Sequence, residues 1–182
     1  KIISEETITL DHENLKETMD KNINAVCIEY ANSELGFVNN IKAVTDIVSD
    51  YSPSAKIVCD LSTQIGRGVL NVDDLGIDLG IMDSQSFGGP SGLGALYVNQ
   101  DLKIENLIHG DHSEFGKRAG IQNVAMISAM GFAAKEMSNS LENEIEHLSN
   151  ITRKTNDYLK VTGNYKINTP PYQLTHGIMN YI

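Results

Sequence analysis

The sequence predicts an α/β fold with a mostly parallel sheet that helices cover on both faces. Two observations lead to this prediction. Apolar runs of strand length alternate along the chain with segments that carry a helical stripe of apolar residues. The strand-length runs are also apolar at consecutive positions, which is typical of strands that are buried on both faces of a parallel sheet. We therefore expect layers of helices around one central sheet.

Four runs of apolar residues have the length and composition of buried strands. They are INAVCIEY (residues 23–30), AKIVCDL (55–61), GIDLGIMDS (76–84) and GALYVN (94–99). Such continuous runs favour strands when turn-forming residues bound them on both sides. We expect these four segments to form the sheet.

Three segments have helical signals. Asp11 is an expected N-cap for residues 12–22, because its side chain can accept from the free amides of the first turn and acidic residues follow it. Residues 38–51 place five apolar side chains on one helical face, and Pro53 ends that helix. Residues 123–160 are helical almost throughout, with Gly131 and the polar segment 138–144 indicating two consecutive helices.

The last part of the chain changes character. Residues 165–182 become extended again, and Pro170 and Pro171 mark a boundary within them. We divide the chain into a partial large domain, residues 1–161, and the beginning of a small C-terminal subdomain, residues 162–182. Because the chain opens on Lys1 rather than Met, we expect it to be a piece of a longer protein.

Composition excludes several classes of function. The chain has 182 residues with 24 acidic and 14 basic side chains, a formal net charge of -10. Nucleic acid is therefore not an expected partner, because phosphate binding requires clustered Lys and Arg. The sequence has neither an apolar run of about 18 residues, the length of a membrane span, nor a signal segment at its start. We expect a cytoplasmic protein.

Both cysteines lie in apolar, strand-like runs. Cys27 and Cys59 occur in AVCIEY and KIVCDL. We expect two buried, reduced thiols and no disulfide framework.

Polar residues follow three of the expected strands. In a parallel sheet, ligands bind where loops leave the carboxyl ends of the strands. Asn32, Asp60 and residues 84–92 lie at such ends, so we compare them as one site. Asp60 can hold a ring nitrogen protonated, cap a helix or coordinate a metal, and Asn32 can contact a ligand or simply form a turn.

The Gly-rich loop SFGGPSGLG and two polar loops leave their function open. The Gly-rich loop allows close approach of the backbone to a phosphate, or makes a tight connection between two strands. It lacks the Gly-Lys-Ser/Thr of a Walker loop and the dinucleotide fingerprint. HGDH, residues 109–112, has side chains that can bind a metal, or it is a surface loop without a ligand. KRAG, residues 117–120, offers an anion contact or a solvated loop.

Five segments, read in order, resemble one known family. They are YANSELG, CDLSTQIGR, GIDLGIMDSQSFGGPSGLGALYV, IHGDHSEFGKRAGIQNV and QLTHGIMNYI. Together they are similar to the middle of a cysteine desulfurase, a class V aminotransferase that uses pyridoxal phosphate. The resemblance implies the large domain of the aspartate-aminotransferase-like fold. It further implies a dimer with active sites at the subunit interface, and a sulfur-acceptor protein as a partner.

The resemblance assigns expected cofactor contacts to several residues. Asp60 falls on the aspartate that pairs with the cofactor's pyridine nitrogen, and Asn32 on an asparagine near its phenolic oxygen. Thr63 stands at the position of a cofactor-binding glutamine, while Gln64 comes one position late. The positions that keep the family's loops are Gly89, Pro90, Gly92 and Gly94 after the lysine loop, and Arg118 and Gly120 in the partner-facing loop.

The departures from the family lie at cofactor contacts. Asp83, Ser84, Gln85 and Ser86 stand in place of Ser-Gly-His-Lys. Ser86 occupies the position of the lysine that forms the Schiff base, and a hydroxyl cannot form that imine. A carboxylate at Asp83 repels a phosphate a few Å away by roughly 1 to 4 kcal/mol, whereas Gln85 still offers an uncharged donor. Ile121 replaces a threonine that reaches a neighbouring subunit's phosphate.

Four functional hypotheses remain at this point. The first is an inactive structural or regulatory subunit, with no catalytic residue and the cofactor lost or bound non-covalently. The second is an enzyme acting on a small amino-acid-like or phosphorylated ligand, with Asp60 as base or electrostatic anchor. The third is the core of a cysteine desulfurase or selenocysteine lyase that mobilises sulfur from cysteine. The fourth is a folded remnant without a retained role.

Overall fold

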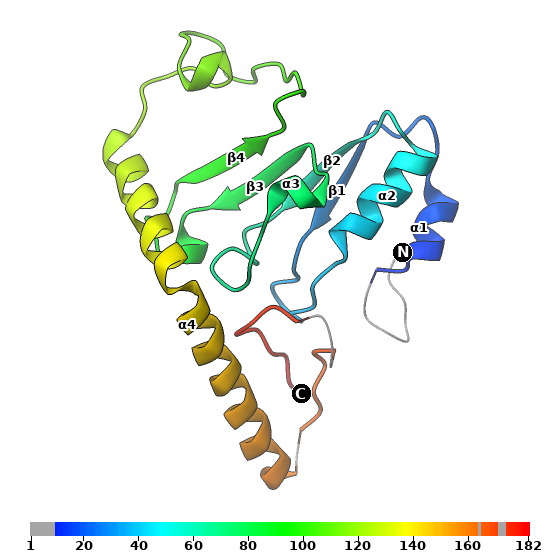
Figure 1. Ribbon diagram of the computed structural model, residues 1–182, viewed down its shortest axis with the longest axis vertical. Coiled ribbons are helices and arrows are strands. Elements are labelled where there is room, and N and C mark those ends of the chain that lie inside the picture. The colour runs from blue at the N-terminus through cyan, green and yellow to red at the C-terminus, as the bar shows by residue number, and fades with distance from the viewer. Residues whose placement is uncertain (1–9, 164, 171–173) are drawn as a thin grey trace.

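A computed structural model describes residues 10–163, 165–170 and 174–182, and its centre is a four-stranded sheet (Figure 1). The strands are β1 (Ala25–Glu29), β2 (Lys56–Asp60), β3 (Leu79–Asp83) and β4 (Gly94–Val98), and they lie in that order across the sheet. The first three pair in parallel and β4 is antiparallel to β3. The predicted α/β class with a mostly parallel sheet is confirmed.

The hydrophobic core lies between the sheet and α2 (Ile41–Tyr51). Val44 and Val48 of the helix are buried against Ile57 and Cys59 of β2. Leu15 of α1 (His12–Thr18) joins the same cluster. Truncating a buried Ile or Leu to Ala in such a core costs about 2–5 kcal/mol of stability.

The helix termini follow the predicted capping residues. Asp11 Oδ1 accepts from the amides of Glu13 and Asn14, at 3.1 and 3.0 Å, so the predicted N-cap is confirmed. The prediction that the helix ends before Pro53 is also confirmed, because α2 ends at Tyr51.

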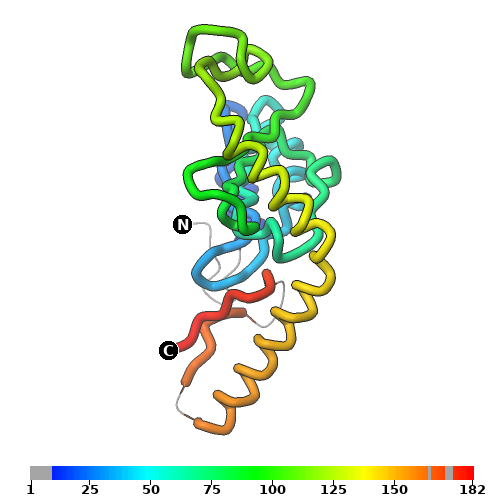
Figure 2. Tube along the Cα trace, turned by 90° about the vertical axis from the view of Figure 1, so that its left-hand side faces the viewer, coloured from blue at the N-terminus to red at the C-terminus, as the bar shows by residue number. Residues whose placement is uncertain are grey.

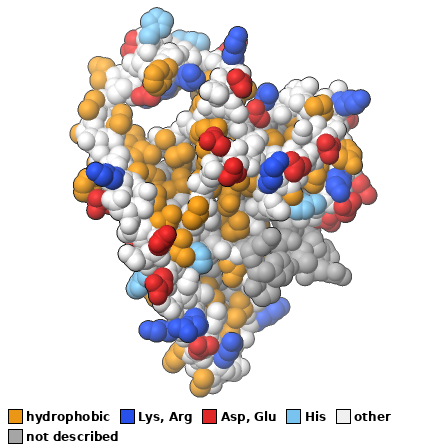
Figure 3. All heavy atoms as spheres, viewed as in Figure 1, with side chains coloured by type: hydrophobic (Ala, Val, Ile, Leu, Met, Phe, Trp, Pro, Cys, Tyr) orange, Lys and Arg blue, Asp and Glu red, His pale blue; other side chains and the backbone are white. Residues whose placement is uncertain are grey.

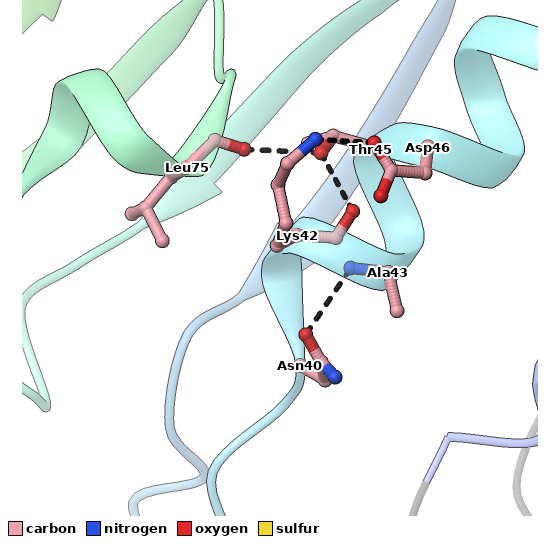
Figure 4. A network of polar contacts seen from close by, with 6 residues as sticks. All are labelled: Asn40, Lys42, Ala43, Thr45, Asp46 and Leu75. Carbon is pink, nitrogen blue, oxygen red and sulfur yellow. Dashed lines mark hydrogen bonds and ion pairs between the residues drawn. The ribbon is translucent and has the colours of Figure 1, made fainter.

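Side-chain hydrogen bonds cap α2 and attach it to α3 (Val72–Leu75), as Figure 4 shows. Asn40 Oδ1 accepts from the amide of Ala43 at 3.1 Å and caps the start of α2. Inside the helix, the Thr45 hydroxyl is shared between the carbonyls of Lys42 and Leu75, at 2.9 and 3.0 Å. These contacts fix the two helices relative to each other on one face of the sheet.

The opposite face of the sheet is partly open in the described part of the chain. Cys27, Ile81 and Leu96 point to this face, because residues paired across parallel or antiparallel strands share a face. Ile81 is 45% exposed and Leu96 is 51% exposed. The prediction that both thiols are buried is wrong for Cys27, which is exposed, and right for Cys59. Cys27 is exposed because β1 is an edge strand and the helices α1 and α2 pack on its other face.

Helix α4 (Val124–Thr162) is a single helix of 39 residues, about 58 Å long at 1.5 Å per residue. The prediction of two consecutive helices is wrong. A Cβ at Gly131 would meet no atom within 4 Å, so no neighbouring segment approaches the helix closely at this glycine and requires its lack of a side chain. The surrounding Ala, Met, Lys and Glu residues are strong helix formers that continue the helix through it.

The C-terminal segment returns along α4, and the two lie side by side in Figures 1 and 2. Its described residues, 165–170 and 174–182, contain a turn at His176 and Gly177, an isolated bridge between Ile167 and Tyr181, and another from Leu174 to Phe37. Pro170 is buried in this segment, whereas the predicted boundary residue Pro171 lies outside the described residues. The division into a large domain and the start of a small one stays a prediction.

Across the described residues, no helix is both long enough and apolar enough to cross a membrane.

Candidate site at the carboxyl ends of the strands

Three carboxylates end the three parallel strands. Glu29 pairs with Asp60 in register, Asp60 pairs with Ile81, and Asp83 lies two residues beyond Ile81. Side chains at paired positions, and at every second position along a strand, share one face. Glu29, Asp60 and Asp83 therefore lie on the same face of the sheet at its carboxyl edge. Sequence reasoning missed Glu29, although its place one residue before the end of the first apolar run was visible.

Asn32 forms a turn and is tied to Glu29. Its Oδ1 accepts from the amides of Glu34 and Leu35, at 3.1 and 2.7 Å. Its Nδ2 donates to Glu29 Oε1 at 2.7 Å. The turn that was one of the two expectations for Asn32 is confirmed, and these contacts engage both ends of its amide.

Asp60 is exposed and caps the turn that follows β2. Its Oδ1 accepts from the amide of Ser62 at 2.9 Å. Burial, with a further contribution from the Asp60 charge, raises the pKa of the neighbouring Cys59 thiol to about 12. Cys59 is therefore a neutral thiol at neutral pH rather than a nucleophile.

Thr63, which we predict at the family's glutamine position, and Gln64, one position later, lie differently. Thr63 is half-buried in the turn after β2. Gln64 is buried, and its Oε1 has no hydrogen-bond partner in the described residues. It lines a small cavity with Asn39, Asn40 and Leu174.

Asp83 and Ser86 form a local pair at the start of the Gly-rich loop. The Ser86 amide donates to Asp83 Oδ1 at 2.7 Å, and the Ser86 hydroxyl donates to Asp83 Oδ2 at 2.9 Å. Asp83 thus accepts two hydrogen bonds from Ser86, inside the 3₁₀ turn η1 (Gln85–Phe87), whose N-cap residue Ser84 makes no side-chain capping bond. Both donors of Ser86 are directed at this internal carboxylate.

The Gly-rich loop is a tight connection between β3 and β4. The Ser84 amide donates to the carbonyl of Leu93 at 2.9 Å, and the Gly89 amide donates to the carbonyl of Ser84 at 2.9 Å. A Cβ at Gly89 would lie 2.1 Å from Ser84 Oγ, so only glycine fits there. Gln85 is exposed beside this turn. Of the two expectations for the loop, the strand connection is confirmed.

The remaining predicted loops lie in the excursion between β4 and α4. Asp111 of the HGDH loop accepts from the Ser113 amide at 2.9 Å, and hydrogen bonds from Ser113 lower the pKa of its carboxyl group. Lys117 and Arg118 are exposed, and Ile121 is 98% exposed. Among the residues that the structure describes, no three His, Cys, Asp or Glu side chains are arranged to hold a metal ion.

The arrangement offers acids and hydroxyls but no amine. No lysine occurs between Lys56 and Lys103, the stretch that contains β2, β3, the Gly-rich loop and β4. The side chains at the strand ends are three carboxylates, one amide and the Ser86 hydroxyl. Such a set can accept hydrogen bonds and hold local turns, but it cannot form an imine with an aldehyde.

Comparison with known proteins assigns the family. The Aminotransferase class-V family model matches residues 1–181. The chain is 36% identical over 142 residues to the cysteine desulfurase IscS of Dictyoglomus turgidum, covering 78% of this chain and 36% of that relative. It is 34% identical over 139 residues to a cysteine desulfurase IscS of Clostridium botulinum, covering 76% and 34%. The chain belongs to the class V aminotransferases, and its relatives are cysteine desulfurases.

Solved structures agree with this assignment. A NifS-like protein has a TM-score of 0.86 at 27% identity, covering 93% of this chain and 46% of that chain. The apo cysteine desulfurase of Thermococcus onnurineus has a TM-score of 0.82 at 16% identity, covering 100% and 49%, and shares the fold. The chain thus spans about a third of the length of the curated relatives and about half of these solved chains.

Proposed function

We propose that this chain is a cysteine-desulfurase-like domain without Schiff-base chemistry, acting as an inactive structural or regulatory subunit. The observation that carries the proposal is the pair formed by Asp83 and Ser86. Ser86, which we predict at the position of the family's lysine, donates both its hydroxyl and its amide to the Asp83 carboxylate.

The strand ends do not fit a phosphorylated aldehyde that is bound through an imine. The chain offers no lysine between Lys56 and Lys103 to form that imine. Glu29, Asp60 and Asp83 give this edge of the sheet a concentration of negative charge, which disfavours a phosphate. Asn32, expected near the cofactor's phenolic oxygen, has its amide engaged by Glu29 and by two backbone amides.

The family's sulfur chemistry remains the second candidate. It is favoured by the identity to cysteine desulfurases and by Asp60, whose Oδ2 is not engaged by another described residue and which stands at the family's aspartate position. In this alternative, the protein mobilises sulfur from cysteine with pyridoxal phosphate and passes it to an acceptor protein.

Sulfide release from cysteine distinguishes the two functions. We expect no release above buffer when the protein is incubated with cysteine and added pyridoxal phosphate, and no effect of Asp60→Asn. Release that Asp60→Asn abolishes would contradict the proposal and support the desulfurase alternative. A desulfurase assayed in parallel is the positive control.

We further propose that the chain pairs with a second subunit, either another copy or an active relative. The support is a group of large apolar side chains that stay exposed between β4 and the first turns of α4. They are Leu107, Ile108, Phe115, Ile121, Val124 and Phe132. Figure 3 shows hydrophobic side chains at the surface between α4 and the strands. The expected cytoplasmic location stays a prediction.

A further inference from the structure

A second cavity lies between the last turns of α4 and the C-terminal segment, which run side by side in Figures 1 and 2. It has a volume of about 320 Å³. Ser149, Arg153 and Lys160 line it from the helix, and Thr175 and His176 line it from the segment. None of the residues expected to contact the cofactor lines it.

Thr175 supplies a buried hydroxyl without a partner. The residue is 2% exposed, and its Oγ1 has no hydrogen-bond partner among the described residues. Its amide donates to the carbonyl of Gly36 at 2.8 Å, which fixes the backbone beside the cavity. Because the hydroxyl oxygen itself is inaccessible to solvent, Thr175 contributes to the wall of the cavity and its hydroxyl is not a donor that a ligand reaches.

Ser149 and His176 together present a neutral donor. Ser149 Oγ lies 2.9 Å from His176 Nδ1. If the serine donates to Nδ1, the neutral ring carries its proton on Nε2; if Nδ1 donates, the serine hydroxyl proton is free. In either tautomer one hydrogen remains for a ligand. Arg67 donates to the carbonyl of His176 at 3.3 Å and holds this part of the segment in place.

The charged groups of the cavity are mainly basic. Arg153 donates to Asn150 Oδ1 at 3.2 Å, and no described carboxylate pairs with its guanidinium. Lys160 Nζ lies 4.0 Å from Asp157 Oδ1, at the limit of an ion pair. Figure 3 shows Lys and Arg side chains around the lower end of α4. Two cations with one carboxylate form a local excess of positive charge in a chain whose net charge is -10.

We propose that this cavity binds a small oxyanion, the phosphate or carboxylate group of a small molecule. The Arg153 guanidinium supplies charged donors, and the Ser149–His176 pair supplies a neutral one. A guanidinium fits the two oxygens of a carboxylate or phosphate, whereas a cationic ligand would meet Arg153 and Lys160. The volume lies at the small end of the range for ligand pockets and suits a molecule the size of an amino acid.

Titration of the protein with inorganic phosphate, and separately with acetate, tests the proposal by NMR of the His176 imidazole. Ionic strength is held constant with chloride, and His176→Gln assigns the signal among the five histidines. We expect a saturable shift with phosphate, acetate or both, and the more effective probe identifies the head group. No saturable shift with either probe would overturn the proposal.

Matched variants separate a built site from general charge attraction. We expect Arg153→Gln to weaken binding about tenfold, the loss of one charged hydrogen-bonded contact. Ser149→Ala removes the hydrogen-bond partner of His176 Nδ1 and is expected to weaken binding about threefold. Lys154→Gln removes the same charge from the adjacent helical position outside the cavity and is expected to change nothing. An equal loss in Lys154→Gln and Arg153→Gln would contradict the proposal.

Discussion

At the scale of single residues, Asp83 and Ser86 act as one unit. The resemblance predicts that both depart from the family, but the sequence does not indicate that the Ser86 hydroxyl and amide donate to Asp83. The Asp83 carboxylate accepts a hydrogen bond from an amide three residues later, which is the spacing between an N-cap side chain and the amide that donates to it. Asn32 and Glu29 form a similar pair. Which side chains meet at the strand ends depends on the face of the sheet to which each one points. A continuous apolar run does not indicate that face, because its residues do not alternate between apolar and polar.

The Asp83–Ser86 contact makes a measurable contribution to stability. Ser86→Ala removes a hydrogen bond to a half-buried carboxylate, and we expect it to lower the free energy of unfolding by about 1 kcal/mol. Urea denaturation measures the change. Ser91→Ala, in the same loop but at an exposed position, is the control and is expected to stay within about 0.5 kcal/mol of wild type. Equal stabilities of Ser86→Ala and wild type would contradict the contact.

The two thiols should differ in reactivity. Cys27 is exposed on the edge strand, whereas Cys59 is buried and its pKa is raised to about 12. We expect a disulfide reagent at pH 8 to modify one thiol quickly in the native protein and both in denaturant. Cys27→Ala should abolish the fast phase, and a fast phase that survives it would contradict the burial of Cys59.

The same pKa shift makes stability depend on pH. The thiol ionises near pH 9.0 in the unfolded chain and near 12 in the folded protein. Below pH 9 the Cys59 thiol is protonated in both the folded and the unfolded state, so its ionisation does not change the free energy of unfolding. Between pH 9 and pH 12 only the unfolded chain releases the thiol proton, so the free energy of unfolding falls as the pH rises.

At the scale of elements, periodicity predicted where helices and strands lie, and it failed where tertiary context decides. The stripe of residues 38–51 and the cap at Asp11 correspond to α2 and α1. The break predicted near Gly131 does not occur, because a lone glycine lowers helix propensity without ending a helix. The exposure of Cys27 depends on the order of strands in the sheet, which a local run of residues does not encode.

Two glycines of α4 should respond oppositely to replacement by alanine. Gly131 lies in the helix interior in open space, so Gly131→Ala is expected to stabilise the protein by about 0.5–1 kcal/mol. Gly163 caps the helix at φ 73°, in the left-handed region, so Gly163→Ala is expected to destabilise it by about 1 kcal/mol. Urea denaturation measures both changes. Destabilisation by Gly131→Ala would instead indicate a break in the helix at that residue.

At the scale of the whole molecule, the exposed apolar side chains before α4 predict association. We expect light scattering on a sizing column to show a dimer, and Ile121→Asp to shift it towards monomer, since a charge in an apolar interface is costly. Val161→Asp places the same charge at an exposed valine near the other end of α4 and is the control. A wild-type monomer that no relative joins on co-purification would contradict the proposed subunit role.

The central claim is that the domain has kept the family's fold and lacks the lysine that forms an imine with pyridoxal phosphate. The most direct test is a visible absorption spectrum of the purified protein after addition of pyridoxal phosphate and desalting. We expect no imine band, because we predict Ser86 at the position of the family's lysine and no lysine lies between Lys56 and Lys103. A retained imine band that borohydride fixes to the protein would show that another amine serves in its place, and the claim would be wrong.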